Sequence, residues 1–158
     1  MNILVLCTGN SARSVLLEAI FNRHGAAHGI RAFSAGSKPA GKVHPETLRL
    51  LSAKGYATAG LRSKSWDEFA APDAPVMDAV ITVCGSAASE VCPFWPGAPA
   101  RAHWGVEDPA AAAPPDQPAA FEEAYGKLLA RANALLSVPP AELTPARLGA
   151  ELSRIGLL

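Results

Sequence analysis

The sequence predicts a three-layer α/β protein, in which helices flank a central sheet of four parallel strands. Two observations carry this prediction. Apolar runs of strand length at residues 3–6 and 78–84 have the continuous hydrophobicity of strands that are buried on both faces of a sheet. An expected helix separates residues 3–6 from another short strand at residues 31–36, and such a crossover makes the two strands parallel. A short fourth strand is expected at residues 101–103.

The expected helices follow the apolar periodicity of the chain and its stop signals. The first covers residues 14–24, the second opens at His44-Pro45-Glu46, and a long helix covers residues 119–136 with a stripe typical of ordinary core packing. A last amphipathic helix is expected at residues 145–155. Ser65 is expected to cap a short helix, and His44 is interpreted as a surface or capping residue and not as a catalytic one.

Length and composition limit the possible functions. The 158 residues are 49% apolar, which is enough for one domain with a substantial core, and residues 139–158 are interpreted as its C-terminal helical extension within residues 1–158. The formal net charge is zero and no long basic run is present, so neither nucleic acid nor a membrane is an expected partner. A core strand directly after Met1 argues against a cleaved signal peptide, and a cytoplasmic location, where thiols stay reduced, is expected.

The strand, loop and helix at the start of the chain predict an oxyanion site. The N–H groups of a short loop between a strand and a helix can all point inward, and the helix N-terminus adds partial positive charge. Arg13 adds a full charge and a planar fork that can bind two oxygens at once. The predicted oxyanion-binding residues are Thr8, Gly9, Asn10, Ser11, Ala12, Arg13 and Ser14.

The same electric field acts on Cys7, which ends the first strand. A free thiol has a pKa near about 8.5, and placement at a helix N-terminus beside an arginine can lower it to about 3.5–7.5. Cys7 is therefore expected to be a nucleophilic thiolate. The alternative is a buried structural cysteine beside a solvated arginine, but the glycine, asparagine and serine between them make a poor core segment.

Residues 7–14 resemble the phosphate loop of the low-molecular-weight protein tyrosine phosphatases and of the arsenate reductases built on the same fold. The resemblance extends over nearly the whole chain and implies a low-molecular-weight phosphatase-like fold. Two activities of that fold remain to be distinguished.

The other two cysteines favour the reductase. Cys84 ends the third predicted strand, and because parallel strands end at one edge of a sheet, its thiol is expected on the same side as Cys7. Cys92 lies in a proline-rich stretch, and the pair resembles the redox pair of thioredoxin-coupled arsenate reductases. A disulfide needs Cα atoms within about 7 Å, so the segment between them would have to bend or unwind. Two unrelated structural cysteines are the alternative.

Asp108-Pro109 resembles the general-acid loop of the same family. Proline restricts the preceding residue to extended geometry, and a carboxylic acid at Asp108 can protonate the oxygen that leaves arsenic or phosphorus. The lead-in His103-Trp104-Gly105 and the alanines at 110–113 are closer to the reductases, since tyrosine phosphatases of this size usually place tyrosines after the acid. Without Cys7, Asp-Pro alone would be interpreted as a common turn.

The resemblance implies arsenic detoxification by reduction of arsenate to arsenite. Arsenate, or phosphate or sulfate in its place, occupies the loop; Cys7 attacks arsenic, Asp108 protonates the departing water, Cys84 attacks Cys7, and Cys92 then attacks Cys84. Cys84 and Cys92 are one residue further apart than in the best-known thioredoxin-linked members, so the reductant of their disulfide is left open between thioredoxin, glutathione with glutaredoxin, and mycothiol. No metal or organic cofactor is required.

Some relatives bind potassium beside the loop through an Asn, a Glu, a Ser and an Asp. Asn10, Glu18 and Ser34 match three of these residues, but the fourth position falls near Lys64, whose charge can replace that of the ion, so no potassium is predicted.

Two other functions are weighed against arsenate reduction. The first is a low-molecular-weight protein tyrosine phosphatase that hydrolyses phosphotyrosine or small aryl phosphates through a Cys7 phosphoenzyme, and weak phosphatase activity is expected even of a reductase. The second is a non-catalytic oxyanion-binding or thiol redox-sensor protein. Asp108 argues against the second, because binding alone needs no acid.

Overall fold

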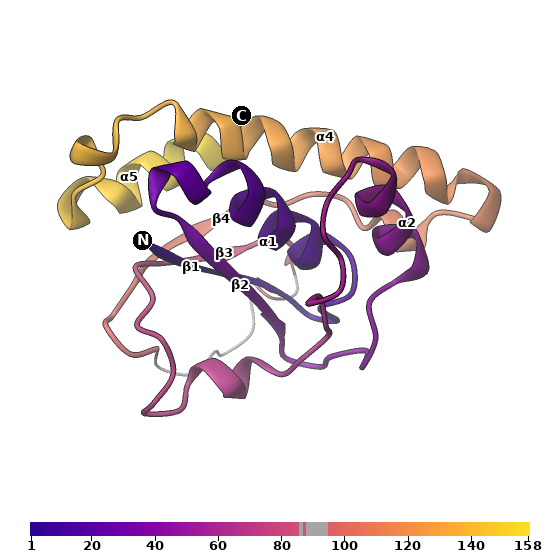
Figure 1. Cartoon of the computed structure of the whole chain (residues 1–158), viewed down its shortest axis with the longest axis horizontal. Coiled ribbons are helices and arrows are strands. Elements are labelled where there is room, and N and C mark those ends of the chain that lie inside the picture. The colour runs from indigo at the N-terminus through magenta and orange to yellow at the C-terminus, as the bar shows by residue number, and fades with distance from the viewer. Residues whose placement is uncertain (86, 88–94) are drawn as a thin grey trace.

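The computed structural model describes residues 1–85, 87 and 95–158, and its centre is a parallel four-stranded sheet (Figure 1). The strands are β1 (Asn2–Cys7), β2 (Arg31–Gly36), β3 (Ala79–Thr82) and β4 (Ala100–His103), in the order β2-β1-β3-β4. All three neighbouring pairs are parallel, and Cys7 of β1 lies opposite Gly36 of β2 at the carboxyl edge. The predicted sheet, flanked by helices, is confirmed.

The longer helices are α1 (Arg13–His24), α2 (Pro45–Ala53), α4 (Gln117–Leu136) and α5 (Pro145–Gly156). Short 3₁₀ helices are η1 (Ala26–His28), η2 (Trp66–Phe69), η3 (Pro109–Ala111), η4 (Pro114–Asp116) and η5 (Pro140–Glu142). The expected caps are present: His44 Nδ1 accepts the N–H of Glu46 at 3.0 Å, and Ser65 Oγ accepts the N–H of Asp67 at 3.2 Å. These side chains satisfy helix N–H groups that have no partner within the helix.

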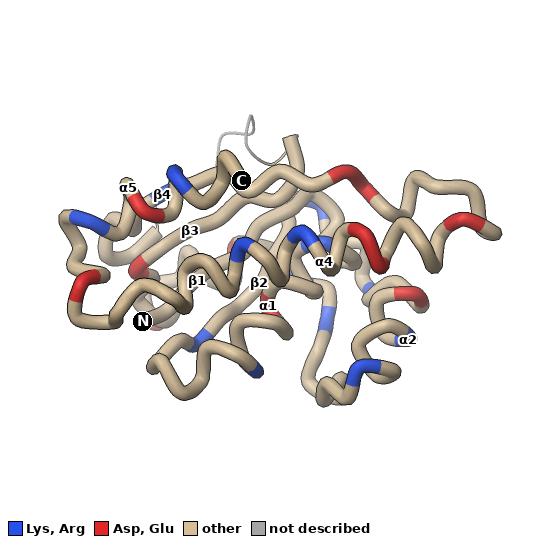
Figure 2. Tube along the Cα trace, turned by 90° about the horizontal axis from the view of Figure 1, so that it is seen from above, with Lys and Arg blue, Asp and Glu red and all other residues tan. Residues whose placement is uncertain are grey.

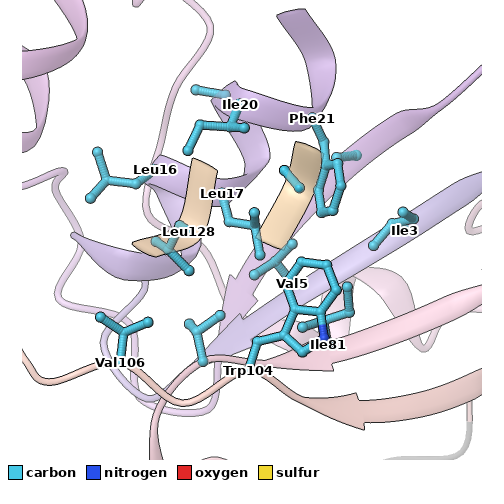
Figure 3. Close-up of a cluster of buried hydrophobic side chains, with 14 of the residues drawn as sticks. Ile3, Val5, Leu16, Leu17, Ile20, Phe21, Ile81, Trp104, Val106 and Leu128 are labelled. Atoms are coloured by element: carbon cyan, nitrogen blue, oxygen red, sulfur yellow. The ribbon is translucent and has the colours of Figure 1, made fainter. Parts of the chain in front are cut away.

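The two faces of the sheet bury two hydrophobic clusters. α1, α4 and α5 cover one face, over the larger cluster, in which Trp104 is fully buried and its ring lies 5.9 Å from that of Phe21 (Figures 1 and 3). The smaller cluster lies on the other face and includes Phe69 of η2. Successive residues of β1, such as Leu4 and Val5, belong to different clusters, which explains why this strand is apolar throughout.

The C-terminal helix α5 packs against β4 and α4. Its residues Leu148, Leu152 and Ile155 are buried in the larger cluster. Gly156 lets the backbone approach closely, because a Cβ at this position would lie 2.5 Å from the carbonyl oxygen of His103. Outside these contacts, α4 and α5 each carry both acidic and basic residues (Figure 2). Of the helices that the structure describes, none is both long and apolar enough to cross a bilayer.

The third strand is shorter than predicted. β3 ends at Thr82, and Val83 still donates its N–H to Leu6 O at 3.0 Å, but the chain then turns, with the N–H of Ala87 directed at Cys84 Sγ at 3.4 Å. The turn begins at Cys84, so Cys84 lies outside the β3 strand. Cys92, the predicted partner of Cys84, lies outside the described residues.

Candidate active site

Residues 8–14, which are the connection after β1 and the first two residues of α1, are called the oxyanion loop below. Its carbonyl groups face the neighbouring segment: Thr8 O accepts the N–H of Lys38 at 3.0 Å, and Gly9 O accepts that of Ala40 at 2.9 Å. In a trans peptide unit the C=O and the following N–H point in opposite directions. The N–H groups of Gly9 and Asn10 are therefore turned away from that segment, and the N–H of Asn10 does point at Cys7 Sγ, 3.2 Å away.

Tight backbone packing holds this loop against β2. A Cβ at Gly36 would lie 2.4 Å from Thr8 O and 2.9 Å from Cys7 O, so only glycine allows the end of β2 to approach the loop this closely. Asn10 has a positive φ of 45°, a left-handed conformation that asparagine tolerates better than most residues. The loop shape therefore depends on residue types on both sides of the contact.

A chain of buried hydrogen bonds directs a donor at the nucleophile candidate. The N–H of Lys64 donates to Asn10 Oδ1 at 2.9 Å, which assigns the orientation of the Asn10 amide. Asn10 Nδ2 then donates to Ser14 Oγ at 2.9 Å, so the Ser14 hydroxyl hydrogen is available for Cys7 Sγ, also at 2.9 Å. Two donors, from Asn10 and Ser14, thus point at a sulfur that is buried, an arrangement that suits a thiolate.

A buried acid and a buried base lie beneath the loop. Ser34 Oγ accepts from Asn10 Nδ2 at 2.9 Å and from Lys64 Nζ at 3.4 Å, and it donates to Glu18 Oε2 at 3.1 Å. Burial raises the pKa of Glu18, and the charge of Lys64 opposes this shift. Burial lowers the pKa of Lys64, and the charge of Glu18 opposes that shift. Lys64 Nζ thus lies among the residues that match the potassium site of some relatives.

Arg13 connects the oxyanion loop to the segment that carries the predicted acid. Its NH1 donates to Val106 O at 2.9 Å, and its NH2 lies 3.7 Å from Asp108 Oδ2. The other carboxylate oxygen of Asp108 accepts the N–H of Ala110 at 3.0 Å and caps η3. The side chain of Asp108 is 44% exposed beside Arg13. The predicted cation and the predicted acid are therefore neighbours.

Cys84 lies beside the oxyanion loop. Its sulfur is 3.7 Å from Thr8 Oγ1, and the residue is buried. Since β1 and β3 are neighbouring parallel strands, Cys7 and Cys84 share the carboxyl edge of the sheet, as the sequence predicts. Within the described residues, no group of three or more His, Cys, Asp or Glu side chains is placed to hold a metal ion.

Sequence reasoning missed the side chains that hold the loop from outside. Ser63 Oγ donates to Gly9 O at 3.1 Å, and Thr47 Oγ1 donates to Ser11 O at 2.9 Å. Thr47 carried a usable signal, because it is a polar residue on the buried face of α2. Ser63 and Gly36 carried none, since their contacts depend on the path of distant segments.

The site can be compared with known proteins. A profile of the family described as low molecular weight phosphotyrosine protein phosphatase matches residues 2–151. An arsenate reductase of Halalkalibacterium halodurans is 35% identical over 115 residues, which cover 73% of this chain and 78% of the relative.

Solved structures of both kinds of protein are similar to this chain. The arsenate reductase from Archaeoglobus fulgidus is 28% identical with a TM-score of 0.61, over 83% of this chain and 98% of that one. The low molecular weight protein tyrosine phosphatase from T. tengcongensis is 26% identical with a TM-score of 0.61, over 82% of this chain and 95% of that one. The similarity to these two solved structures therefore does not separate the two activities, and the side chains around Cys7 are needed to do so.

Proposed function

Because the chain belongs to the low molecular weight phosphotyrosine protein phosphatase family, we propose that it uses this family's site to reduce arsenate to arsenite. One observation carries the proposal: the Cys84 thiol lies beside the oxyanion loop, 3.7 Å from Thr8 Oγ1. Phosphoester hydrolysis needs only the nucleophile, the arginine and the acid. A second thiol at the loop is useful for a reaction that transfers electrons. The similarity to curated arsenate reductases supports the same choice.

In the first step, the inward N–H groups of the oxyanion loop and the guanidinium of Arg13 bind arsenate. The Cys7 thiolate attacks arsenic and forms an S–As bond, while one As–O bond breaks. Asp108, 3.7 Å from Arg13 NH2, donates the proton that lets the oxygen depart as water. No electrons have been transferred at this stage, and arsenic remains As(V).

The second step is the reduction. The Cys84 thiolate attacks Cys7 Sγ, a disulfide bond forms, and the S–As bond breaks with its electron pair remaining on arsenic. Arsenic becomes As(III) and leaves as arsenite, and the two cysteines are oxidised together. Access and thiolate fraction govern the rate of such an exchange, which is why the position of Cys84 matters.

The third step restores Cys7. The Cys92 thiolate attacks Cys84 Sγ, Cys7 leaves as a thiolate, and a Cys84–Cys92 disulfide remains. An external dithiol such as thioredoxin, or glutathione with glutaredoxin, supplies the two electrons that reduce it. The three-cysteine relay needs no metal ion and no organic cofactor.

A phosphatase is the second candidate, and the geometry of Cys7, Arg13 and Asp108 favours it as a side activity. The same cradle accepts phosphate, and the similarity to a solved tyrosine phosphatase is as close as that to a solved reductase. We propose weak hydrolysis of aryl phosphates through a Cys7 phosphoenzyme, with arsenate reduction as the main reaction.

The two activities are separated by one pair of assays. Arsenite production is followed with thioredoxin, thioredoxin reductase and NADPH, and hydrolysis of an aryl phosphate is measured on the same preparation. We expect multiple-turnover arsenate reduction and slow hydrolysis. Fast hydrolysis without arsenate reduction would make the protein a phosphatase. Retention of multiple-turnover reduction by Cys92→Ser would show that an external thiol, and not Cys92, completes the cycle.

A further inference from the structure

The segment that carries Asp108, residues 104–108 between β4 and η3, is called the acid loop below. Its first residue, Trp104, is fixed in the core (Figure 3): the residue is fully buried, and its indole Nε1–H donates to Leu152 O of α5 at 2.8 Å. Its backbone N–H donates to Thr82 O of β3 at 2.7 Å. The acid loop therefore starts from a point that β3 and α5 hold together.

The next residue, Gly105, is held by Arg131 of α4. Arg131 NH1 donates to Gly105 O at 3.1 Å, and Arg131 NH2 donates to Leu158 O, just beyond α5, at 3.2 Å. Arg131 is a buried residue, and burial lowers the pKa of its guanidinium. A methionine or leucine would fill this space without desolvating a charge. Arg131 instead directs its donors at Gly105 O of the acid loop and at a carboxyl-group oxygen of Leu158, the last residue of the sequence.

Three residues of chain connect this contact to Asp108. Directly after Gly105, the Val106 N–H donates to Val83 O at 3.1 Å, and Val106 O accepts Arg13 NH1 at 2.9 Å. Asp108 follows two residues later, 3.7 Å from Arg13. Arg131 of α4 thus binds the carbonyl of Gly105, and Arg13 binds the carbonyl of the next residue, Val106.

We propose that Arg131 is a positioning residue for Asp108. Through Gly105 O, it fixes the direction in which the acid loop leaves β4, and α5 completes the anchor through Trp104. The C-terminal helix is therefore part of the machinery that orients the acid, and not only a cover for the core. This inference rests on the proposed function, in which Asp108 donates the proton to the leaving oxygen.

A double-mutant cycle on the full chain tests this coupling. Arg131→Met, Asp108→Asn and the double variant are compared by the single-turnover rate of arsenite release, by aryl phosphate hydrolysis and by inhibition with phosphate. We expect Arg131→Met to slow the chemical step roughly tenfold, part of the 10²–10⁴-fold contribution of a general acid, with phosphate inhibition unchanged within about twofold. In the Asp108→Asn background, Arg131→Met has no further effect. Arg131→Lys, which keeps a cationic donor nitrogen, recovers most of the rate.

The cycle also contains outcomes that overturn the inference. The same loss in both backgrounds, or no loss in either, means that Arg131 does not act through Asp108. Arg154→Met is the matched control, since Arg154 lies on α5 and contacts Glu151 at 2.9 Å. Its rates should equal those of the unmodified chain. If Arg131→Met does not fold, Arg131→Gln carries the same cycle, and Arg131→Lys remains the variant that restores the rate.

Hydrogen exchange gives a readout that does not depend on activity. We expect Arg131→Met to speed exchange of the amides of residues 103–110, with the rest of α4 and α5 unchanged. Equal acceleration across both helices would make Arg131 a general stabiliser and would overturn the inference. An unmodified chain that neither reduces arsenate nor hydrolyses aryl phosphate would instead contradict the proposed function, and the exchange experiment would still decide whether Arg131 orders the acid loop.

Discussion

Cys7 and Cys84 occupy similar places in the fold but have different surroundings. Cys7 is the last residue of β1, and Cys84 lies just after the end of the parallel strand β3. Each sulfur faces the N–H of the residue three positions later, at 3.2 Å from Asn10 N for Cys7 and at 3.4 Å from Ala87 N for Cys84. Cys7 has a second close contact, Ser14 Oγ at 2.9 Å. The hydroxyl that contacts Cys84 is Thr8 Oγ1 at 3.7 Å, a distance longer than that of a strong hydrogen bond.

The difference indicates two roles. The donors of Cys7 are oriented by buried residues that are fixed before any substrate arrives, with Lys64 setting the Asn10 amide and Asn10 setting Ser14. The contacts of Cys84 are longer than those of Cys7, and its side-chain contact is with the oxyanion loop itself. A preorganised sulfur suits attack on an oxyanion, whereas a second sulfur beside the same loop suits attack on the first.

The largest effect is expected when the first sulfur, that of Cys7, is removed. Cys7→Ser should lower both arsenate reduction and aryl phosphate hydrolysis by at least about 10³-fold, because both proposed reactions begin with this nucleophile. Steady-state assays of both activities measure the loss. If either activity persisted in Cys7→Ser, another nucleophile would be responsible for it.

Removal of the second sulfur, that of Cys84, should affect arsenate reduction and aryl phosphate hydrolysis differently. Cys84→Ser is expected to stop multiple-turnover arsenate reduction while leaving aryl phosphate hydrolysis within about threefold, because hydrolysis uses only Cys7, Arg13 and Asp108. Serine keeps the size of the side chain and so limits the change in packing. Equal loss of both activities would indicate that Cys84 acts through the structure of the loop.

Two hydroxyl deletions sharpen the comparison further. Ser14→Ala removes a hydrogen bond to the proposed thiolate and should slow both activities by about 10- to 100-fold, the effect of 1.5–3 kcal/mol. Thr8→Val removes the hydroxyl beside Cys84 and should slow arsenite release severalfold with little effect on hydrolysis. The measurement is a single-turnover rate for each substrate, and the opposite pattern would reverse the assigned roles.

The N-terminal residues of the site could be predicted from the sequence because they are contiguous. Cys7, the oxyanion loop and Arg13 lie on one strand–loop–helix unit, and Asp108 was found through its proline. The contacts of Ser63 and Arg131 could not be predicted, because they depend on how distant loops and α5 pass the catalytic edge. Apolar periodicity places elements relative to a core, but it carries no information about which carbonyl a polar side chain will reach.

The smallest expected effect concerns the buried acid beneath the loop. The pKa of Glu18 in the folded chain is raised above its usual value of 4.5, because burial favours the protonated carboxyl group. The protonated side chain therefore contributes fully to the stability of the folded chain below pH 4.5, and this contribution is lost as the pH rises through the folded pKa. The difference in free energy of unfolding between the unmodified chain and Glu18→Gln should therefore shift in favour of Gln between pH 4 and pH 7. Urea unfolding at both pH values measures it; a shift in favour of Glu would contradict the assignment.

The most direct test of the central claim uses Cys92→Ser in a single turnover with arsenate and no added thiol. With Cys92 removed, the relay should stop after the second step, with about one equivalent of arsenite released and a Cys7–Cys84 disulfide found by peptide mapping and mass spectrometry. Arsenite release with Cys84 still a free thiol, or no release until an external thiol is added, would contradict the proposal that Cys84 reduces the Cys7 adduct.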